Sequence, residues 1–456
     1  MDRPPHHPDE ATSNAARDTI ARVEPRTLRT YTPTQAVLAR SAGVFHWTPE
    51  GRRLYDFSSG VLVANLGHNP RDWLLRIRQY LGWDALDRGS APFVETVPLT
   101  AYNAITPVEV EASRRLVDLL RSRPGGRRLE QVMWAASGSE AVQKALWAAL
   151  ARDRTRDIII ATRYGFHGKK GLAGATTGCE TDPERDPRVR FISFPMDECR
   201  DVSLRGSAFT PLPYRRELDA LRQEFGRRLS VLITEPYLGG GGSYHPPKAY
   251  LQLLQDFCRA NDIVFILDEI QSSFGRTGQL FAYETYGLEP DVVVLGKGLA
   301  NGVPGAAAVG PAALFGRMDY GEGSDTYSAN PLTCAGVLAT LDAYTSGEVL
   351  ANVRRVSRII EEGLVRLKEL PFIKHVRGED CGMVWGVETA DYGGKSAAEV
   401  ANACVLACYR GNGADGVHLL GPLAKKVIRV APPLVMTEDE AKHAMTLIHE
   451  ALRGLR

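Results

Sequence analysis

The sequence lacks an excess of either charge. Its 456 residues include 55 Lys and Arg against 54 Asp and Glu, which gives a formal net charge of +1. Proteins that bind nucleic acid or anionic membranes usually concentrate positive charge on one surface. The nearly equal numbers of basic and acidic residues do not indicate a positively charged surface of this kind. We therefore expect small molecules or other proteins as partners and no nucleic acid.

The sequence also lacks a long apolar run. No stretch reaches the roughly 18 to 20 apolar residues that span a bilayer, so we expect no membrane segment. The start of the chain, "MDRPPHHPDEATSN", is polar and rich in proline, without the apolar core of a signal peptide. We expect residues 1–30 to be flexible, with His6 and His7 exposed to solvent.

Cysteines in zinc-binding pairs are absent as well. The seven cysteines are odd in number and scattered, which suits a reducing compartment, and we expect a cytoplasmic protein. Cys404 and Cys408 lie on one face of a predicted helix. No His or acidic residue completes a metal site there, so we interpret both as core residues and expect no metal.

Short apolar runs alternate with helical patterns through the middle of the chain. Runs of this kind are typical of strands buried in a parallel sheet. We expect these strands at residues 131–137, 157–162, 230–235, 263–269 and 291–296. Helical patterns occupy residues 140–152 and 246–261 between them. The alternation predicts an α/β fold with a mostly parallel central sheet.

The length of the chain exceeds the size at which a single core stops growing, so we expect two domains. Near residue 333 the pattern changes to longer amphipathic helices, such as residues 352–370. Residues 43–60 have the pattern of a hairpin that turns at "PEG". The expected division is a flexible segment 1–30, part of a smaller α+β domain at 31–75, a large domain at 76–333, and the rest of the smaller domain at 334–456. The segment 178–225, rich in Pro, Asp, Arg and Ser, is expected to be an irregular surface excursion.

Polar residues that follow the predicted strands are the first candidates for a site, because ligands bind at the carboxyl ends of such strands. After the first strand, "SGSEA" places Gly138 and Ser139 at a helix start. Amide groups at a helix start bind phosphate well. An ordinary helix cap is the alternative for this motif.

The second strand is followed by "RYGFHGKKG". This is not a phosphate-binding P-loop, because Arg163 stands where a glycine is needed and Lys170 where Ser or Thr should stand. Phe166, held on a bare loop, suits stacking on a planar ring. A buried aromatic plug is the alternative.

Asp268 and Lys297 close the fourth and fifth predicted strands. A carboxylate at the end of an apolar run requires a partner, either a cation in the site or a structural salt bridge. A lysine partly withdrawn from water, as Lys297 is between Gly296 and Gly298, suits Schiff-base chemistry, although a surface lysine is the alternative. A phosphate cradle, a stacking aromatic, an acid and an amine together indicate pyridoxal 5′-phosphate.

Several motifs in order then resemble one family. These are "SGSEAV", "FHG", "EP", "LDEIQSSFGRTG", "GKGLANGVPGA", "DTYSANPLTCAG" and "VIRVAPPL". The series is similar to that of the class III aminotransferases, which are fold type I pyridoxal phosphate enzymes, and the similarity runs from about Phe57 to the C-terminus.

The resemblance implies catalytic and ring-binding roles for five residues. Lys297 is expected to be the Schiff-base lysine and proton shuttle, and Asp268 the partner of the pyridinium nitrogen. Ile270 is expected to pack on the ring face opposite Phe166. Gln271 is expected to bond the phenolic oxygen.

The resemblance also implies the remaining contacts. Gly138 and Ser139 are expected to hold the phosphate, with Thr326 reaching it from the neighbouring subunit of a homodimer that shares its active sites. Arg429 resembles the arginine that grips a substrate carboxylate. Together these roles imply a transaminase that moves an amino group from an amine or amino-acid donor to an α-keto acid.

The sequence departs from the family pattern at two positions. Gly240 stands where members with ω-amino donors often carry a Glu that pairs with the arginine, so we expect neither an ornithine-type nor a 4-aminobutyrate-type enzyme. Lys169 replaces the more usual Arg, without a physical reason in the sequence. Val61 and Val63 are expected to shape the substrate pocket from either subunit.

Other functions of the same cofactor stay open at this point. Decarboxylation, amine migration and racemisation differ only in which bond at Cα is broken, which the sequence does not determine. A non-catalytic homologue that binds pyridoxal phosphate or a protein partner is the rival outside enzymology. The intact Lys297, Asp268 and Thr326 argue against that rival.

Overall fold

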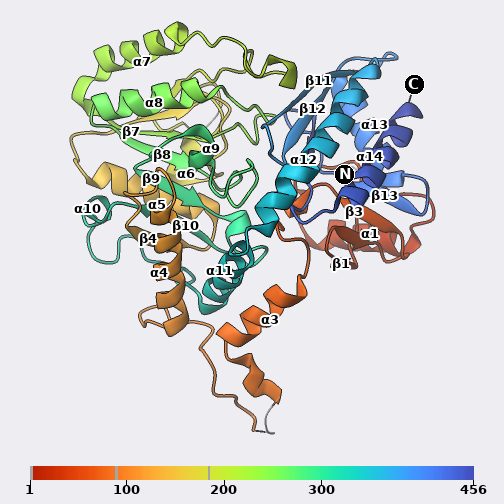
Figure 1. Cartoon of the computed structure of the whole chain (residues 1–456), viewed down its shortest axis with the longest axis horizontal. Helices are drawn as coiled ribbons and strands as arrows, with labels where there is room; N and C mark the ends of the chain where they lie inside the picture. Colours follow the sequence, from red (N-terminus) through yellow and green to blue (C-terminus); the bar gives the residue numbers. More distant parts are fainter. Residues whose placement is uncertain (1–3, 88–90, 183–184, 456) are drawn as a thin grey trace. The chain divides into compact units, whose positions relative to one another are not determined.

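A computed structural model describes residues 4–87, 91–182 and 185–455. The chain divides into a small unit of Met1–Pro70 with Val349–Arg456 and a large unit of Arg71–Glu348 (Figure 1). The large unit ends later than the predicted residue 333, because helix α11 (Pro331–Tyr344) belongs to it. This helix is apolar on all sides and packs against α3 (Arg71–Tyr80) and α4 (Pro107–Ser122).

A seven-stranded sheet forms the centre of the large unit. Its order is β4 (Gln131–Ala135), β10 (Ala306–Gly310), β9 (Val292–Leu295), β8 (Val264–Asp268), β7 (Leu229–Thr234), β5 (Ile158–Thr162) and β6 (Val189–Ile192). Strand β10 is antiparallel to both of its neighbours, β4 and β9, and the pairs from β9 to β6 are parallel. The expected α/β fold with a mostly parallel sheet is confirmed, as are the five strands predicted from apolar runs.

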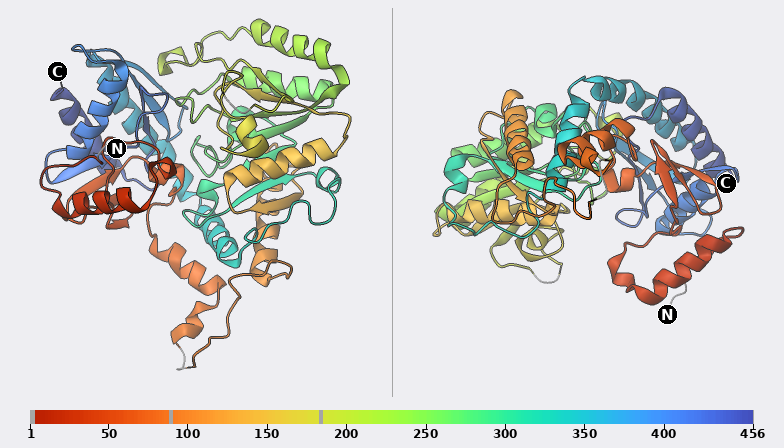
Figure 2. Two further views of the ribbon diagram at one scale, coloured as in Figure 1. Left: turned by 180° about the vertical axis from the view of Figure 1, so that it is seen from behind. Right: turned by 90° about the horizontal axis from the view of Figure 1, so that it is seen from below.

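Both faces of this sheet are buried, as is usual for parallel strands. Successive residues along β7, such as Val231 and Leu232, are fully buried although they point to opposite faces. Helix α5 (Gly138–Ala151) packs across β4, β7, β8, β9 and β10. The other helices of the unit, besides α3, α4 and α11, are α6 (Gly171–Ala175), α7 (Leu212–Phe225), α8 (Lys248–Ala260), α9 (Ala282–Tyr286) and α10 (Ala312–Phe315). Figure 2 shows this unit from two further sides.

The segment 178–225 differs from our expectation of an irregular excursion. It contains strand β6, at the edge of the sheet, and the 14-residue helix α7. Leu218 is the buried residue of α7. The Pro, Asp, Arg and Ser content of the segment led to the prediction, although a surface helix can carry such residues on its outer face.

The small unit contains two sheets. One has the order β1 (Arg40–Ala42), β2 (Phe45–Trp47), β3 (Arg53–Asp56) and β13 (Asp415–His418), and the other β11 (Ile373–Gly378), β12 (Trp385–Thr389) and β14 (Val427–Val430). Its longer helices are α12 (Glu348–Arg366), α13 (Ala397–Arg410) and α14 (Glu438–Arg453). The predicted hairpin is confirmed as β2 and β3, and β3 pairs in parallel with β13. This pairing joins the N-terminal and C-terminal parts of the unit.

The described part of the chain also contains short 3₁₀ turns. They are η1 (Arg26–Leu28), η2 (Trp83–Asp87), η3 (Val202–Leu204), η4 (Gly226–Arg228), η5 (Lys297–Leu299) and η6 (Leu367–Glu369). No helix in the described ranges is both long and apolar enough to cross a membrane.

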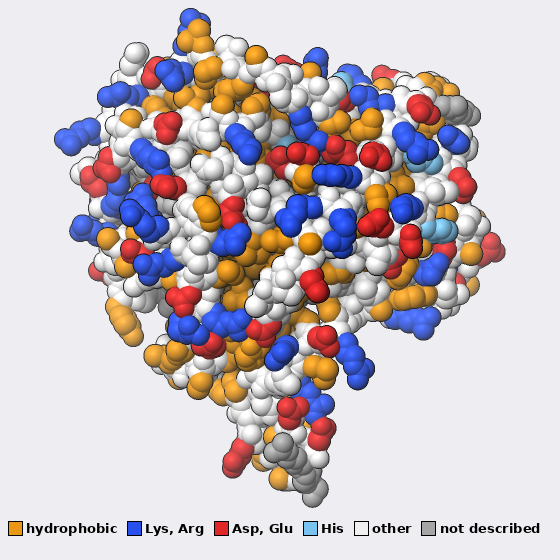
Figure 3. All heavy atoms as spheres, in the orientation of Figure 1, with side chains coloured by type: hydrophobic (Ala, Val, Ile, Leu, Met, Phe, Trp, Pro, Cys, Tyr) orange, Lys and Arg blue, Asp and Glu red, His pale blue; other side chains and the backbone are white. Residues whose placement is uncertain are grey.

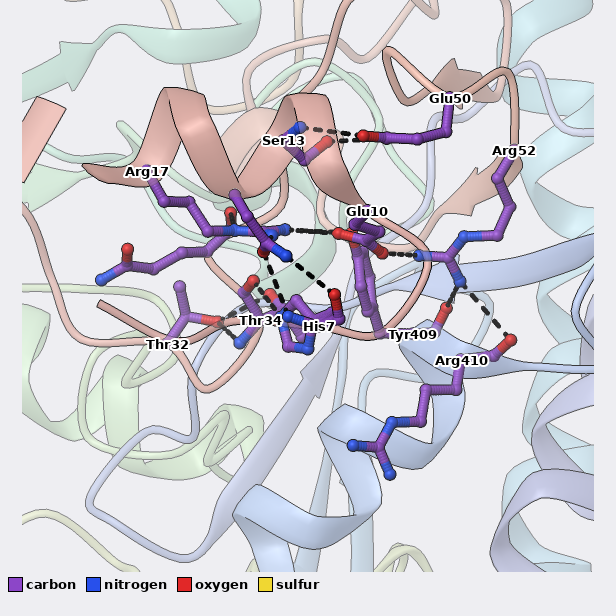
Figure 4. Close-up of polar contacts among 12 residues, drawn as sticks. His7, Glu10, Ser13, Arg17, Thr32, Thr34, Glu50, Arg52, Tyr409 and Arg410 are labelled. Atoms are coloured by element: carbon purple, nitrogen blue, oxygen red, sulfur yellow. Dashed lines mark hydrogen bonds and ion pairs between the residues drawn. The ribbon is translucent and has the colours of Figure 1, made fainter. Parts of the chain in front are cut away.

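The flexible N-terminal segment that we expected is instead partly helical. Helix α1 (Ala11–Val23) buries Ser13 and Arg17. Arg17 donates to Glu10 at 2.7 Å, and the same carboxylate accepts from the hydroxyl of Tyr409 at 3.1 Å (Figure 4). His6 is exposed as expected, but His7 is buried and its ring lies 2.8 Å from the carbonyl oxygen of Thr34. The prediction failed because the buried side chains of α1 are polar, so hydrophobic periodicity does not reveal the helix.

The short element α2 (Ser59–Leu62) is a left-handed turn. The φ angles of Ser59, Gly60, Val61 and Leu62 are 48°, 58°, 68° and 61°. Left-handed backbone costs a residue other than glycine roughly 1–2 kcal/mol. Asp56 holds the start of the turn by accepting from the amides of Ser58 and Ser59 at 2.8 and 3.0 Å.

Candidate active site

A cavity of about 580 Å³ lies at the carboxyl ends of the parallel strands in the large unit. Its lining comes from the residues that follow β4, β5, β7, β8 and β9 along the chain. They are Ser137, Gly138, Ser139, Glu140, Phe166, His167, Gly168, Lys169, Lys170, Glu235, Asp268, Ile270, Gln271 and Lys297. The structure therefore brings together every residue predicted to be catalytic or to bind the cofactor, except Thr326.

One end of the cavity is the start of helix α5. The side chain of Ser137 accepts from the amide of Glu140, whose carboxylate accepts from the amide of Ser137 at 3.1 Å, so the two form a capping box. The amides of Gly138 and Ser139 lie at the first helical positions, where N–H groups have no partner within the helix. A Cβ added at Gly168 would lie 2.3 Å from the hydroxyl of Ser139. The loop after β5 thus approaches the helix start closely and leaves room for backbone contact with an anion.

Asp268 ends β8 and has His167 as its partner. Nδ1 of His167 lies 2.7 Å from Oδ2 of Asp268, and both side chains are almost fully buried. Oδ1 of Asp268 accepts from the amide of Ile270 at 3.1 Å. Nε2 of His167 is buried and has no hydrogen-bond partner within the part of the chain that the structure describes.

Glu235 follows β7 directly and was not among the predicted site residues. It accepts hydrogen bonds from the amides of Phe166 at 2.9 Å and Gly239 at 3.3 Å. Burial raises the pKa of Glu235 to about 7, and the nearby Asp268 carboxylate adds to the rise. Glu235 therefore fixes the backbone of the loop that carries Phe166.

The glycine-rich loop after Glu235 packs tightly on two predicted ring contacts. A Cβ added at Gly239 would lie 2.3 Å from Oε1 of Gln271, and one added at Gly240 would lie 3.1 Å from the Cβ of Phe166. Close packing thus favours glycine at position 240, because a side chain there would press on Phe166. Nothing in the structure explains Lys169, which lines the cavity beside them.

Lys297 begins the 3₁₀ turn η5 directly after β9, with a φ of 46°. Its side chain is half-buried and lines the cavity. A Cβ added at Gly296 would lie 3.3 Å from Ile270, and one added at Gly138 would lie 2.8 Å from the same side chain. The side chain of Ile270 thus occupies the space beside Gly296 and Gly138, where neither glycine has a side chain, and it lines the cavity there.

Thr326, Arg429 and Val61 are not part of the lining of this cavity. Thr326 is exposed, beside Asp325, which accepts from Nζ of Lys144 at 2.6 Å. Arg429 is buried on β14, in the small unit. Val61, on the left-handed turn, is 40% exposed and also belongs to the small unit.

The residues that line the cavity match the chemistry of pyridoxal phosphate. A helix start with glycine and serine suits the phosphate. An amine at a strand end suits the aldehyde, and a buried carboxylate suits the pyridinium nitrogen. Phe166 and Ile270 supply apolar contact for the ring. The donor set contains each of the four components that the cofactor requires.

Comparisons with known proteins agree with this fit. The family model "Aminotransferase class-III" matches residues 27–452. The acetylornithine aminotransferase of Oceanobacillus iheyensis is 27% identical over 439 residues, covering 94% of this chain and 96% of that protein. The 4-aminobutyrate aminotransferase of Mycobacterium leprae is 28% identical over 430 residues, covering 91% of this chain and 90% of that protein.

Solved structures share the same fold. An (S)-enantioselective omega-transaminase from Thermomicrobium roseum superposes with a TM-score of 0.78 at 25% identity, covering 96% of this chain and 98% of that one. The ornithine aminotransferase from Toxoplasma gondii gives a TM-score of 0.78 at 23% identity, covering 99% of both chains. At that identity the second likeness concerns the fold alone.

Proposed function

The chain belongs to the class III aminotransferase family and is a pyridoxal phosphate-dependent transaminase, and we propose how its own residues carry out the amino transfer. The cofactor, when bound, serves as an electron sink for the carbanion formed at the donor Cα. The observation that carries the proposal is the meeting of Lys297, the Asp268–His167 pair and the start of α5 in one cavity.

Lys297 supplies the amine that attaches the cofactor covalently. Its Nζ would move the proton from the donor Cα to the cofactor in the first half of the exchange, and from the cofactor to the Cα of the acceptor in the second half. The position of Lys297, half-buried in the lining of the cavity, supports this role, because the amine lies beside the residues that suit the cofactor.

Asp268 provides the negative charge that holds a proton on the ring nitrogen. The 2.7 Å contact from His167 and the amide of Ile270 fix the direction of its carboxylate. His167 is thus a positioning residue for Asp268, a role that the sequence did not reveal. The sequence feature that could have indicated this role is the position of His167 next to Phe166, with a glycine on either side of the pair.

Binding of the cofactor is distributed over three elements. Gly138 and Ser139 donate backbone amides to the phosphate, aided by the dipole of α5. Phe166 and Ile270 pack against the ring, and Gln271 bonds the phenolic oxygen. Each of these five residues lines the cavity.

We also propose a homodimer in which Thr326 of one chain reaches the phosphate of the other. Residues 91–105 of the large unit have no helix or strand and carry exposed apolar side chains, with Phe93 88% and Ile105 80% exposed. Figure 3 shows apolar side chains in orange among charged and other side chains on the face that it draws. Large exposed apolar groups in one segment are typical of an interface. Asn330, four residues from Thr326, donates to the carbonyl of Leu99 in this segment at 2.5 Å.

The substrates that we propose are an amino-acid or amine donor and an α-keto acid acceptor, with a substrate carboxylate bound by Arg429. Gly240 provides no side chain to pair with that arginine. We therefore expect acceptors and donors whose carboxylate is attached to the reacting carbon to be favoured over ornithine and 4-aminobutyrate, which react at an ω-amine. The cytoplasmic location stays a proposal, supported by seven free cysteines.

A donor panel tests this function. Alanine, ornithine, 4-aminobutyrate, β-alanine and an aryl amine are each combined with pyruvate and 2-oxoglutarate, and the keto product, the amino product and CO2 are measured. We expect equal amounts of both organic products, strict dependence on the keto acid and no CO2. Preference for ornithine with 2-oxoglutarate would contradict the role given to Gly240, and CO2 without a keto acid would contradict transamination.

A further inference from the structure

The small unit contains a second cluster of side chains, with no assigned role. His46 on β2, Asp56 at the end of β3 and His68 each present one ligand atom, and these atoms lie within 4.8 Å of one another. Nε2 of His68 is 2.7 Å from Oδ2 of Asp56, and Nε2 of His46 is 3.6 Å from the same oxygen. Two imidazoles thus face one carboxylate oxygen.

The backbone brings these residues together from separate parts of the chain. His46 and Asp56 lie on the paired strands of the β2–β3 hairpin. His68 is joined to the turn between β1 and β2 by two backbone hydrogen bonds with Gly43, both 2.8 Å long. The cluster is therefore built on rigid elements rather than on a loose loop.

The carboxylate is oriented before any ligand arrives. Oδ1 of Asp56 accepts from the amide of Ser58 at 2.8 Å, from its hydroxyl at 2.7 Å and from the amide of Ser59 at 3.0 Å. These three bonds occupy Oδ1 and leave Oδ2 directed at the two histidines.

The ring of His46 is oriented in the same way. The hydroxyl of Ser41 lies 2.7 Å from its Nδ1, which directs Nε2 towards Asp56. Histidines that bind metals almost always have their second nitrogen held by such a partner. Asp56 and His46 thus each have one atom occupied by a supporting hydrogen bond and one atom facing the cluster.

A third histidine lies at the edge of the cluster. His418 is the residue paired with Asp56 in the parallel β3–β13 ladder, and its ring centre is 5.5 Å from that of His46. Its Nδ1 is buried and finds no hydrogen-bond partner among the described residues. A buried imidazole nitrogen in that state is unusual without a ligand.

We propose that His46, Asp56 and His68 bind a divalent transition metal ion of the Zn²⁺ type, with water in the fourth position. Two imidazole nitrogens and one carboxylate oxygen are a ligand set that Zn²⁺ accepts, at about 2.0–2.2 Å from each atom. Ligand atoms of a tetrahedral zinc site lie roughly 3.3 Å apart. When the metal ion binds, the 2.7 Å distance between Nε2 of His68 and Oδ2 of Asp56 therefore lengthens by a few tenths of an ångström. The 3.6 Å distance between Nε2 of His46 and the same oxygen shortens by a similar amount.

The metal ion has a structural role in this proposal. Asp56 also holds the amides that open the left-handed turn at Ser59–Leu62. A metal ion on Oδ2 would fix Asp56 further and so stabilise a turn whose backbone is strained.

Metal titration of the pyridoxal phosphate-loaded enzyme tests the proposal. The protein is treated with EDTA, desalted and titrated with ZnCl₂ by calorimetry, and Tm is measured with and without Zn²⁺. We expect one Zn²⁺ per chain and a higher Tm. His46→Gln and His68→Gln should each lower the affinity at least tenfold and abolish the Tm shift, and Ser41→Ala should lower the affinity about tenfold. His6→Gln, at an exposed histidine outside the cluster, serves as the control and should change nothing.

Co²⁺ gives a second measurement that does not depend on how the histidine variants fold. The difference spectrum between Co²⁺-loaded and metal-free enzyme should show the visible bands of a four-coordinate site, weakened in Ser41→Ala. Absence of Zn²⁺ binding, unchanged binding by the folded His46→Gln and His68→Gln enzymes, loss of binding in His6→Gln, or absence of the Co²⁺ bands would each overturn the proposal.

Discussion

At the scale of single residues, two of the carboxyl groups that line the cavity, those of Asp268 and Glu235, have different surroundings. Asp268 meets the ring N–H of His167 and one amide, whereas Glu235 meets only two backbone amides. Burial therefore raises the pKa of Glu235 to about 7. Two carboxyl groups at neighbouring strand ends are thus suited to different tasks, one to the cofactor and one to the loop that carries Phe166.

The raised pKa of Glu235 predicts a change of stability with pH. The folded protein holds the proton up to about pH 7, while the unfolded chain, in which the carboxyl group has its ordinary pKa of 4.5, releases it earlier. The stabilisation is complete below pH 4.5 and is lost as pH rises to about 7, by up to about 3 kcal/mol. Glu235→Gln should remove this part of the dependence.

The measurement is the Tm of wild type and Glu235→Gln between pH 4.5 and 8. The difference in Tm should move in favour of the variant as pH rises. Glu224→Gln, at an exposed carboxylate of α7, is the matched control and should follow wild type. A wild-type to Glu235→Gln difference that stays constant over this range would contradict the assigned pKa.

Sequence reasoning found the site residues that directly follow an apolar run or belong to a family motif, such as Lys297 and Asp268. It missed His167 as the partner of Asp268, because that pairing depends on how β5 and β8 are placed in the sheet. It missed Glu235 for the same reason, since one of the amides that it binds, that of Phe166, belongs to the loop after β5. The roles themselves stay predictions, while the cavity brings most of these side chains together.

At the scale of elements, apolar runs and helical periodicity predicted the strands and helices with strong apolar patterns. Strand β10 was missed because its sequence, "AAAVG", is mostly alanine, and β6 because it lies in a polar segment. Helix α1 was missed because Arg17 and Ser13 are buried through hydrogen bonds rather than apolar contacts. Patterns of hydrophobicity reveal elements only where burial is apolar.

The left-handed turn gives a prediction at this scale. Val61 has a φ of 68° and a ψ of 52°, a conformation that costs a β-branched residue roughly 1–2 kcal/mol. Val61→Gly should therefore stabilise the protein by about 1 kcal/mol, after part of the gain is offset by the freedom of glycine in the unfolded chain. The free energy of unfolding is measured by denaturant titration.

A matched valine should respond with the opposite sign. Val110, exposed in the regular helix α4, should lose about 0.5–1 kcal/mol on replacement by glycine. A loss of stability in Val61→Gly as large as that in Val110→Gly would show that the turn is not strained.

At the scale of the whole chain, both ends contribute to one unit. Glu10 near the N-terminus bonds Arg17, Arg52 and Tyr409, and the partners come from parts of the sequence nearly 400 residues apart. The hairpin pattern at residues 43–60 led to the prediction that the N-terminal and C-terminal parts of the chain share one unit. They did not predict this buried ion-pair network, because each member alone has the composition of a surface residue.

The exposed apolar segment predicts the state of assembly. Phe93→Glu combined with Ile105→Glu should place two charges in the proposed interface, because both side chains are largely exposed in the single chain. Sedimentation velocity should show a dimer for wild type and a monomer for the double variant, with loss of activity because Thr326 no longer reaches a neighbour. Leu212→Glu, at an exposed leucine of α7, should remain dimeric. A fully active wild-type monomer would contradict the shared site.

The attachment of the cofactor through Lys297 is the central claim, and peptide mapping after borohydride reduction tests it most directly. Reduction makes the bond between lysine and cofactor permanent, so mass spectrometry identifies the residue that carries it. We predict a pyridoxyl group on Lys297 and its disappearance in Lys297→Ala, together with loss of amino transfer. A pyridoxyl group on Lys169 or Lys170, the other lysines that line the cavity, or near-normal transamination by Lys297→Ala, would contradict it.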